Sequence, residues 1–64
     1  MRNNLKNIRM SEYLMSSTEF AKMLGVSITT YSNWETGVSK PGLDKALEIS
    51  KKLNRTIEEI WYLE

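Results

Sequence analysis

The stretch that decides the fold is residues 15 to 37, which read MSSTEFAKMLGVSITTYSNWETG. Ser16 can cap the amide of Glu19, while the carboxylate of Glu19 can reach back to the amide of Ser16. This capping box predicts a helix over residues 16–24. Gly25 follows and favours a left-handed stop, so both ends of the helix are set by local sequence.

A second helix is predicted after only two more residues. Ser27 can cap it, Tyr31 and Trp34 share one side of it, and Gly37 ends it, which gives a helix over residues 28–36. Two short helices joined by so short a glycine-containing turn cannot lie antiparallel and must cross steeply. The sequence therefore predicts helix-turn-helix geometry.

Helical spacing continues on both sides of this pair, and no stretch alternates polar and apolar residues over strand length. A first helix is predicted from Leu5, Ile8, Tyr13 and Leu14. A fourth is predicted from Leu43, Ala46, Leu47, Ile49, Ser50 and Leu53, with Asn54 as its stop. A second capping box, from Thr56 to Glu59, predicts a fifth helix that continues into Ile60, Trp61 and Leu63. We expect an all-α fold of five short helices, without a sheet, in a single domain over residues 1–64.

Composition excludes several classes of function. Cysteine and histidine are both absent from the 64 residues, which removes disulfides, thiolate nucleophiles, histidine bases and zinc sites built from these ligands. Glu58 and Glu59 are adjacent on a predicted helix and point to different sides, so no catalytic pair of carboxylates is expected. We expect no enzyme, no cofactor and no metal. A polar start and the lack of an apolar run of about 18 residues predict a cytoplasmic chain that does not enter a membrane.

The net charge of +1 is too balanced to indicate nucleic-acid binding by itself. Its distribution is uneven, with +2 over residues 1–40 and −1 over residues 41–64. A polyanion would therefore meet the first two-thirds of the chain, although ordinary solubility explains these figures equally well. Lys6, Arg9 and Lys22 could add diffuse attraction, or could simply be solvated.

A longer pattern of residues extends this motif over most of the chain. It comprises Met15-Ser16, Phe20-Ala21, Leu24-Gly25-Val26-Ser27, Tyr31-Ser32-Asn33-Trp34-Glu35, Gly37, Pro41, Leu43, Ala46-Leu47, Ile49, Leu53, Ile57 and Ile60. The pattern resembles the phage-repressor type of helix-turn-helix, the Cro-like or xenobiotic-response-element family, over about residues 5 to 61. The resemblance implies a compact five-helix, lambda-repressor-like domain of bacterial or phage origin, in which the second and third helices form the motif. It further implies a sequence-specific regulator that binds double-stranded DNA, most simply a repressor acting as a dimer.

At 100° per residue, the third helix has two distinct sides. The side expected to face the core carries Ser27, Tyr31 and Trp34. The opposite side carries Thr29, Ser32, Asn33 and Thr36, with Ile28 and Glu35 at its flanks. Hydroxyl and amide groups can bond base edges, and an isoleucine can meet a thymine methyl. A solvated helix face with no binding role would have the same composition. The family resemblance is therefore what favours a surface that contacts DNA bases.

The resemblance implies specific roles for residues on and around this helix. Base contacts are implied for Ser27, Ile28, Thr29 and Asn33. Phosphate contacts are implied for Ser17, Thr36, Ser39 and Lys40. The chain departs from the family at Ser17, where a glutamine is usual, and at Ile28, where a polar or basic residue is more frequent. The segment between Arg9 and Ser16 is also about one residue longer than usual.

The apolar chain end has two interpretations. Ile57, Trp61, Tyr62 and Leu63 either complete the core or form a twofold interface between two copies. The interface would place two recognition helices about 34 Å apart, one duplex turn. An alternative function keeps the fold but uses this end to dock a different protein, as in an antitoxin or an antirepressor-controlled module.

Overall fold

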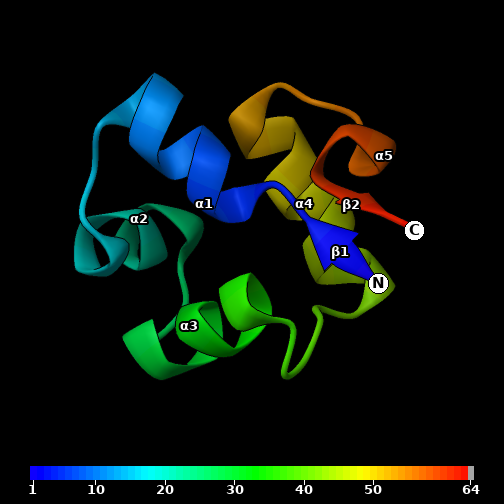
Figure 1. Ribbon diagram of the computed structural model, residues 1–64, viewed down its shortest axis with the longest axis horizontal. Coiled ribbons are helices and arrows are strands. Elements are labelled where there is room, and N and C mark those ends of the chain that lie inside the picture. Colours follow the sequence, from blue (N-terminus) through cyan, green and yellow to red (C-terminus); the bar gives the residue numbers. More distant parts are fainter. Residues whose placement is uncertain (64) are drawn as a thin grey trace.

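The computed structural model describes residues 1–63, and Figure 1 shows their arrangement. The elements in chain order are β1 (Arg2–Asn3), α1 (Leu5–Ile8), the π-helix η1 (Arg9–Tyr13), α2 (Ser17–Leu24), α3 (Ile28–Thr36), α4 (Leu43–Leu53), α5 (Ile57–Ile60) and β2 (Trp61–Tyr62). The all-α class, with α2 and α3 as the helix-turn-helix, is confirmed. None of the helices within residues 1–63 is both long and apolar enough to cross a membrane.

Both ends of α2 and α3 and the start of α5 form as their local sequence predicts. The Ser16 side chain accepts from the Glu19 N–H at 3.2 Å, while the Glu19 carboxylate accepts from the Ser16 N–H at 2.9 Å. Thr56 and Glu59 make the same reciprocal pair at the start of α5. Gly25 and Gly37 take positive φ angles of 77° and 85°, which a residue without Cβ adopts at little cost. Both glycines therefore end their helices as expected.

The first helix differs from the expectation. α1 is only four residues long, and the chain then widens into the π-helix η1. A π turn accommodates one residue more than an α turn, and it occurs where the sequence between Arg9 and Ser16 is longer than usual. Leu14 ends η1 in the left-handed region with 82% of its side chain exposed, so the inclusion of Leu14 in an apolar helix face was wrong.

The expectation of no sheet was also wrong. Arg2 pairs with Tyr62 and Asn3 with Trp61 in a two-stranded antiparallel ribbon that joins the chain ends (Figure 1). Trp61 is extended, with φ −117° and ψ 133°, so α5 ends at Ile60 and does not include the following residues. Two-residue strands are too short for an alternating pattern, and their partners are far apart in sequence, so nothing local could indicate them.

The core lies where the helices meet. Its buried apolar residues are Leu5, Ile8, Phe20, Ala21, Leu24, Tyr31, Trp34, Ala46, Ile49, Leu53, Ile60 and Trp61. The ring of Phe20 contacts those of Tyr13 and Tyr31 edge to face, each with centroids 5.5 Å apart, and so ties η1 to α3 through α2. α4 buries a narrower stripe than predicted, because Leu43 and Leu47 are exposed.

Candidate nucleic-acid interface

The amino end of α3 is fixed by its cap. Ser27 lies just before the helix and accepts from the Thr30 N–H at 3.1 Å, while its own hydroxyl donates to the Thr30 hydroxyl at 3.0 Å. The cap holds the Ser27 side chain outside the helix, where it is exposed. The prediction that Ser27 faces the core was therefore wrong, because a cap residue leaves the helical angle series that the prediction assumed.

The two sides of α3 otherwise divide as predicted. Tyr31 and Trp34 are buried, with 0% and 6% of their surface exposed. On the other side Thr29, Ser32 and Thr36 are exposed, and Asn33 is half-buried. Ile28, at the flank, exposes 41% of its side chain. In Figure 1, α5 lies at the far end of the molecule from α3, so the polar side of α3 is not covered by the last helix.

The loop after α3 folds back on the helix. The Ser39 N–H donates to the Asn33 carbonyl at 3.1 Å, and this holds the exposed residues Ser39 and Lys40 close to the end of α3. Thr36 donates its hydroxyl proton to the Ser32 carbonyl at 2.9 Å. Its hydroxyl must therefore rotate away from that carbonyl before it can donate to a phosphate.

The amino end of α2 carries the remaining predicted contact. Ser17 is the first residue of α2 and is half-buried. Phe20 is the first residue of α2 to donate an intrahelical bond, to the Ser16 carbonyl at 2.9 Å, and the Glu19 N–H is taken by the Ser16 side chain, so the N–H groups of Ser17 and Thr18 remain available to an anion. The Glu19 carboxylate lies at the same end, and its capping bonds hold its pKa below the usual value. A permanent negative charge there weakens the attraction of this helix end for phosphate.

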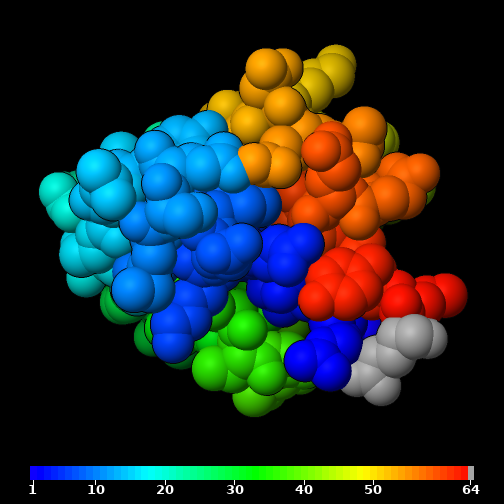
Figure 2. All heavy atoms as spheres, turned by 45° about the horizontal axis from the view of Figure 1, so that its top comes forward, coloured from blue at the N-terminus to red at the C-terminus, as the bar shows by residue number. Residues whose placement is uncertain are grey.

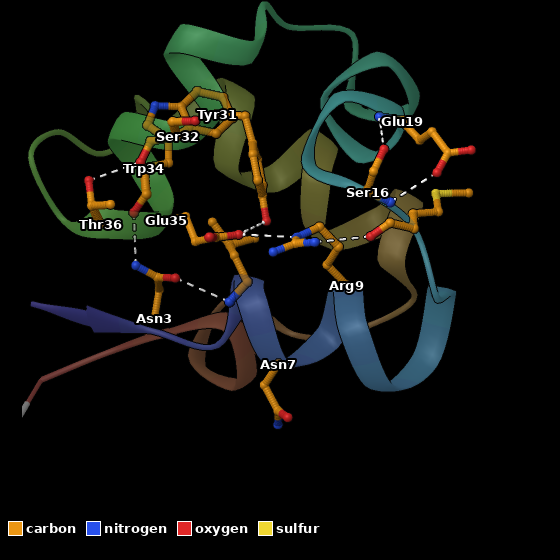
Figure 3. A network of polar contacts seen from close by, with 12 residues as sticks. Asn3, Asn7, Arg9, Ser16, Glu19, Tyr31, Ser32, Trp34, Glu35 and Thr36 are labelled. Atoms are coloured by element: carbon orange, nitrogen blue, oxygen red, sulfur yellow. Dashed lines mark hydrogen bonds and ion pairs between the residues drawn. The ribbon is translucent and has the colours of Figure 1, made fainter.

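Arg9, Tyr31 and Glu35 form a polar network behind α3 (Figure 3). Arg9 Nε lies 3.2 Å from the Glu35 carboxylate, and Arg9 Nη1 donates to the Met15 carbonyl at 3.0 Å. The Tyr31 hydroxyl donates to the same Glu35 oxygen. Only 11% of the Arg9 side chain and 16% of the Glu35 side chain are exposed. The diffuse attraction considered for Arg9 is therefore contradicted, whereas Lys6 and Lys22 are exposed.

This network removes a negative charge from the vicinity of the reading side. Burial raises the pKa of the Tyr31 hydroxyl, and its bond to Glu35 raises it further. Burial alone lowers the pKa of Arg9, but its hydrogen bonds with Tyr31 and Glu35 and the Glu35 charge outweigh that effect, so the pKa rises. Tyr31 is therefore neutral and Arg9 charged at physiological pH, and Arg9 neutralises the Glu35 carboxylate.

The apolar chain end divides between core and surface. Trp61 is buried and Ile57 half-buried, so these two largely complete the core. Tyr62 exposes 37% of its surface and Leu63 83%. A hollow of about 270 Å³ lies next to Ile57 and Trp61, and is also lined by Met1, Lys40, Pro41, Leu43 and Ala46. Figure 2 shows the N-terminal (blue) and C-terminal (red) residues side by side, to the right of the green residues at the end of α3.

Comparison with known proteins places the chain in a family. No curated protein matches it. A family model described as helix-turn-helix matches residues 5–60, which is nearly the whole chain. The chain therefore belongs to the helix-turn-helix family of Cro and phage-repressor type, whose members are DNA-binding transcription regulators.

Proposed function

We propose that this regulator is a repressor that binds an operator as a dimer, with α3 in the major groove. One observation carries the proposal: the side of α3 opposite the buried Tyr31 and Trp34 is open, polar and uncharged. A major groove about 12 Å wide admits one helix, and each base pair shows a distinct pattern of donors and acceptors there.

Base reading falls to four residues at the amino half and middle of α3. Asn33 is the central one, because none of its side-chain atoms is hydrogen-bonded within residues 1–63 and an amide can bond adenine N6 and N7 together. Ile28 meets a thymine methyl, while Ser27 and Thr29 offer hydroxyls to neighbouring base edges. Reading by neutral groups makes binding more specific and less dependent on salt.

Phosphate contacts on either side of α3 set its register. They come from Ser17 at the start of α2, from Thr36 at the end of α3, and from Ser39 and Lys40 in the folded-back loop. Lys40 is the only cation among these four residues, so it supplies most of the charge-dependent affinity. Its position beside the end of α3 is supported by the bond between the Ser39 N–H and the Asn33 carbonyl.

The second copy is proposed to cover the exposed chain end. Tyr62 and Leu63 form the exposed part of this interface, and Ile57 and Trp61, which line the hollow, form its more buried part. One copy is 26 Å along its longest axis, which is shorter than the distance of about 34 Å between half-sites one duplex turn apart. Reading two half-sites therefore requires two copies.

Selection of bound duplexes from a random pool tests the proposal most directly. We expect an inverted repeat whose half-site centres are separated by one helical turn or a multiple of it. Recovery of sequences with no common motif would refute sequence-specific binding. A motif present only once per recovered duplex would support sequence-specific binding but refute binding as a dimer.

Sedimentation at micromolar concentration tests the interface without DNA. We expect wild-type protein to sediment as a dimer and Leu63→Asp, which places a charge on the most exposed apolar residue of the interface, to sediment as a monomer. The exposed Leu14→Asp is the matched control and should remain dimeric. A monomeric wild type would favour the alternative in which this end docks a different protein.

A further inference from the structure

Asn3 links three elements through one short side chain and its backbone. Its Nδ2 donates to the carbonyl of Trp34 in α3 at 2.9 Å, across 31 positions of sequence. Its Oδ1 accepts from the Leu5 N–H at 3.1 Å, at the start of α1. Its backbone pairs with Trp61 in the ribbon. Figure 3 shows its amide lying between the end of α3 and the start of α1.

The carbonyl that Asn3 binds lies where α3 ends. The last carbonyls of a helix have no partner within the helix and need one from outside. The Trp34 carbonyl also accepts from the N–H of Gly37, the left-handed residue that closes α3, at 3.1 Å. Asn3, in the N-terminal strand, therefore donates a second hydrogen bond to the Trp34 carbonyl, which accepts the bond that closes the final turn of α3.

The groups proposed to meet DNA depend on this turn. Asn33 directly precedes Trp34, and its carbonyl accepts from the N–H of Ser39 in the loop that carries Lys40. If the final turn of α3 opened in a fraction of the molecules, both the Asn33 side-chain amide and the loop that carries Lys40 would be displaced in that fraction. DNA would then bind only the closed fraction, and the apparent affinity would fall in proportion to that fraction.

We propose that Asn3 is a positioning residue for DNA recognition: its side-chain amide holds the carboxyl end of α3, so that Asn33 and the following loop meet the duplex in register. Asn3 itself need not touch the DNA. The inference rests on the function proposed above for α3. Through Asn3, the N-terminal strand β1 would contribute to recognition of the DNA sequence although it lies outside the helix-turn-helix.

Two matched variants isolate this bond. Asn3→Asp keeps an acceptor for the Leu5 N–H but removes the donor to the Trp34 carbonyl. Asn4→Asp makes the same chemical change one residue later, where the Asn4 amide donates to the carbonyl of Glu59 in α5 at 3.0 Å instead. Both variants add one negative charge, and the affinity for a random duplex shows whether general repulsion from DNA differs between them.

Affinity is measured for the duplex recovered by selection and for a random duplex of equal length. The temperature is one at which circular dichroism shows both variants fully folded, so that a loss of stability alone does not change the binding constant. We expect Asn3→Asp to bind the selected duplex about tenfold more weakly than Asn4→Asp does, in line with the loss of one half-buried hydrogen bond. Affinity for the random duplex should be the same for both variants.

Amide exchange followed by NMR gives an independent readout at Gly37, whose N–H shares the Trp34 carbonyl with Asn3. Exchange there should accelerate in Asn3→Asp and not in Asn4→Asp. Equal affinities of the two variants for the selected duplex, while the wild type discriminates between duplexes, would overturn the role of Asn3 alone. A wild type that does not discriminate would overturn the proposed function, and the role of Asn3 with it.

Discussion

Replacing Arg9 with methionine tests how much of the fold depends on the polar network behind α3. The change removes the Arg9 bonds to Glu35 and to the Met15 carbonyl and leaves the Glu35 carboxylate with Tyr31 as its hydrogen-bond partner. The methionine retains an apolar stem of similar length, so lost packing contributes little.

The expected magnitude follows from burial. Breaking a buried ion pair typically costs about 3–5 kcal/mol, because one charge is left without a partner in a medium that solvates it poorly. The Glu35 side chain is 16% exposed and keeps its hydrogen bond from Tyr31, so we expect a lower cost in the free energy of unfolding, of about 2–4 kcal/mol. A domain of this size is stable by only roughly 3–5 kcal/mol, so Arg9→Met should lose much of its stability.

Urea unfolding followed by tryptophan fluorescence measures this loss, because Trp34 and Trp61 are both buried. With a urea dependence of about 1 kcal/mol per molar, the midpoint should fall by about 2 M or more. The matched control, Lys6→Met, removes an exposed cation and should leave the midpoint nearly unchanged. If the two variants had the same midpoint, the network would not stabilise the fold.

Three further predictions concern DNA binding and pH. Asn33→Ala should weaken binding to the selected duplex by about 1–3 kcal/mol and leave binding to a random duplex unchanged. The control Asn7→Ala makes the same change on the exposed side of α1 and should affect neither affinity. Equal losses on both duplexes in Asn33→Ala would contradict base reading by Asn33. Lys40→Ala should lower affinity for all duplexes and reduce the salt slope by about one, and an unchanged slope would remove Lys40 from the phosphate contacts. The lowered pKa of Glu19 in the folded state means that its contribution to stability is complete above the ordinary value of 4.5 and is lost as the pH falls through the folded value. When the pH is lowered from 6 to an acidic value, the melting temperature of Glu19→Gln should therefore fall less than that of the exposed control Glu58→Gln. Equal falls would show that protonation of Glu19 does not weaken the Ser16–Glu19 capping box.

The parts of the fold that the sequence predicts are those fixed within a few residues. Ser16 and Glu19 are three positions apart, and Gly25 acts through its own backbone, so each can be identified without knowledge of the rest of the chain. The same is true of the buried side of α3, because Tyr31 and Trp34 follow helical spacing. The extra residue before Ser16 was visible in the sequence, although its structural result, a π-helix, was not.

The parts that were missed depend on partners distant in sequence. Arg9 looks like any surface cation until Glu35 is placed beside it, 26 positions away. The amide of Asn3 has no local partner that predicts its bond to α3, and the ribbon pairs residues from opposite ends of the chain. Sequence reasoning thus did not identify Asn3, and it named Arg9 only as a cation that could attract DNA. Only a general pairing rule for buried charges could have suggested the pairing of Arg9 with Glu35.

The small number of cations among the proposed DNA contacts connects the proposed mode of reading with the proposed dimer. Arg9 is held by Glu35, and Lys40 is the sole cation among the predicted phosphate contacts, so the predicted contacts of one copy carry little positive charge. Each phosphate neutralised contributes roughly 0.9 to the salt slope, and a single copy should therefore bind random DNA weakly and with a shallow slope. A second copy adds a second reading surface, and once one half-site is bound the other binds at high local concentration. If nonspecific affinity is low, as we expect, neutral groups on two copies of α3 give a favourable ratio of specific to nonspecific binding, whereas a single copy should bind its site only weakly.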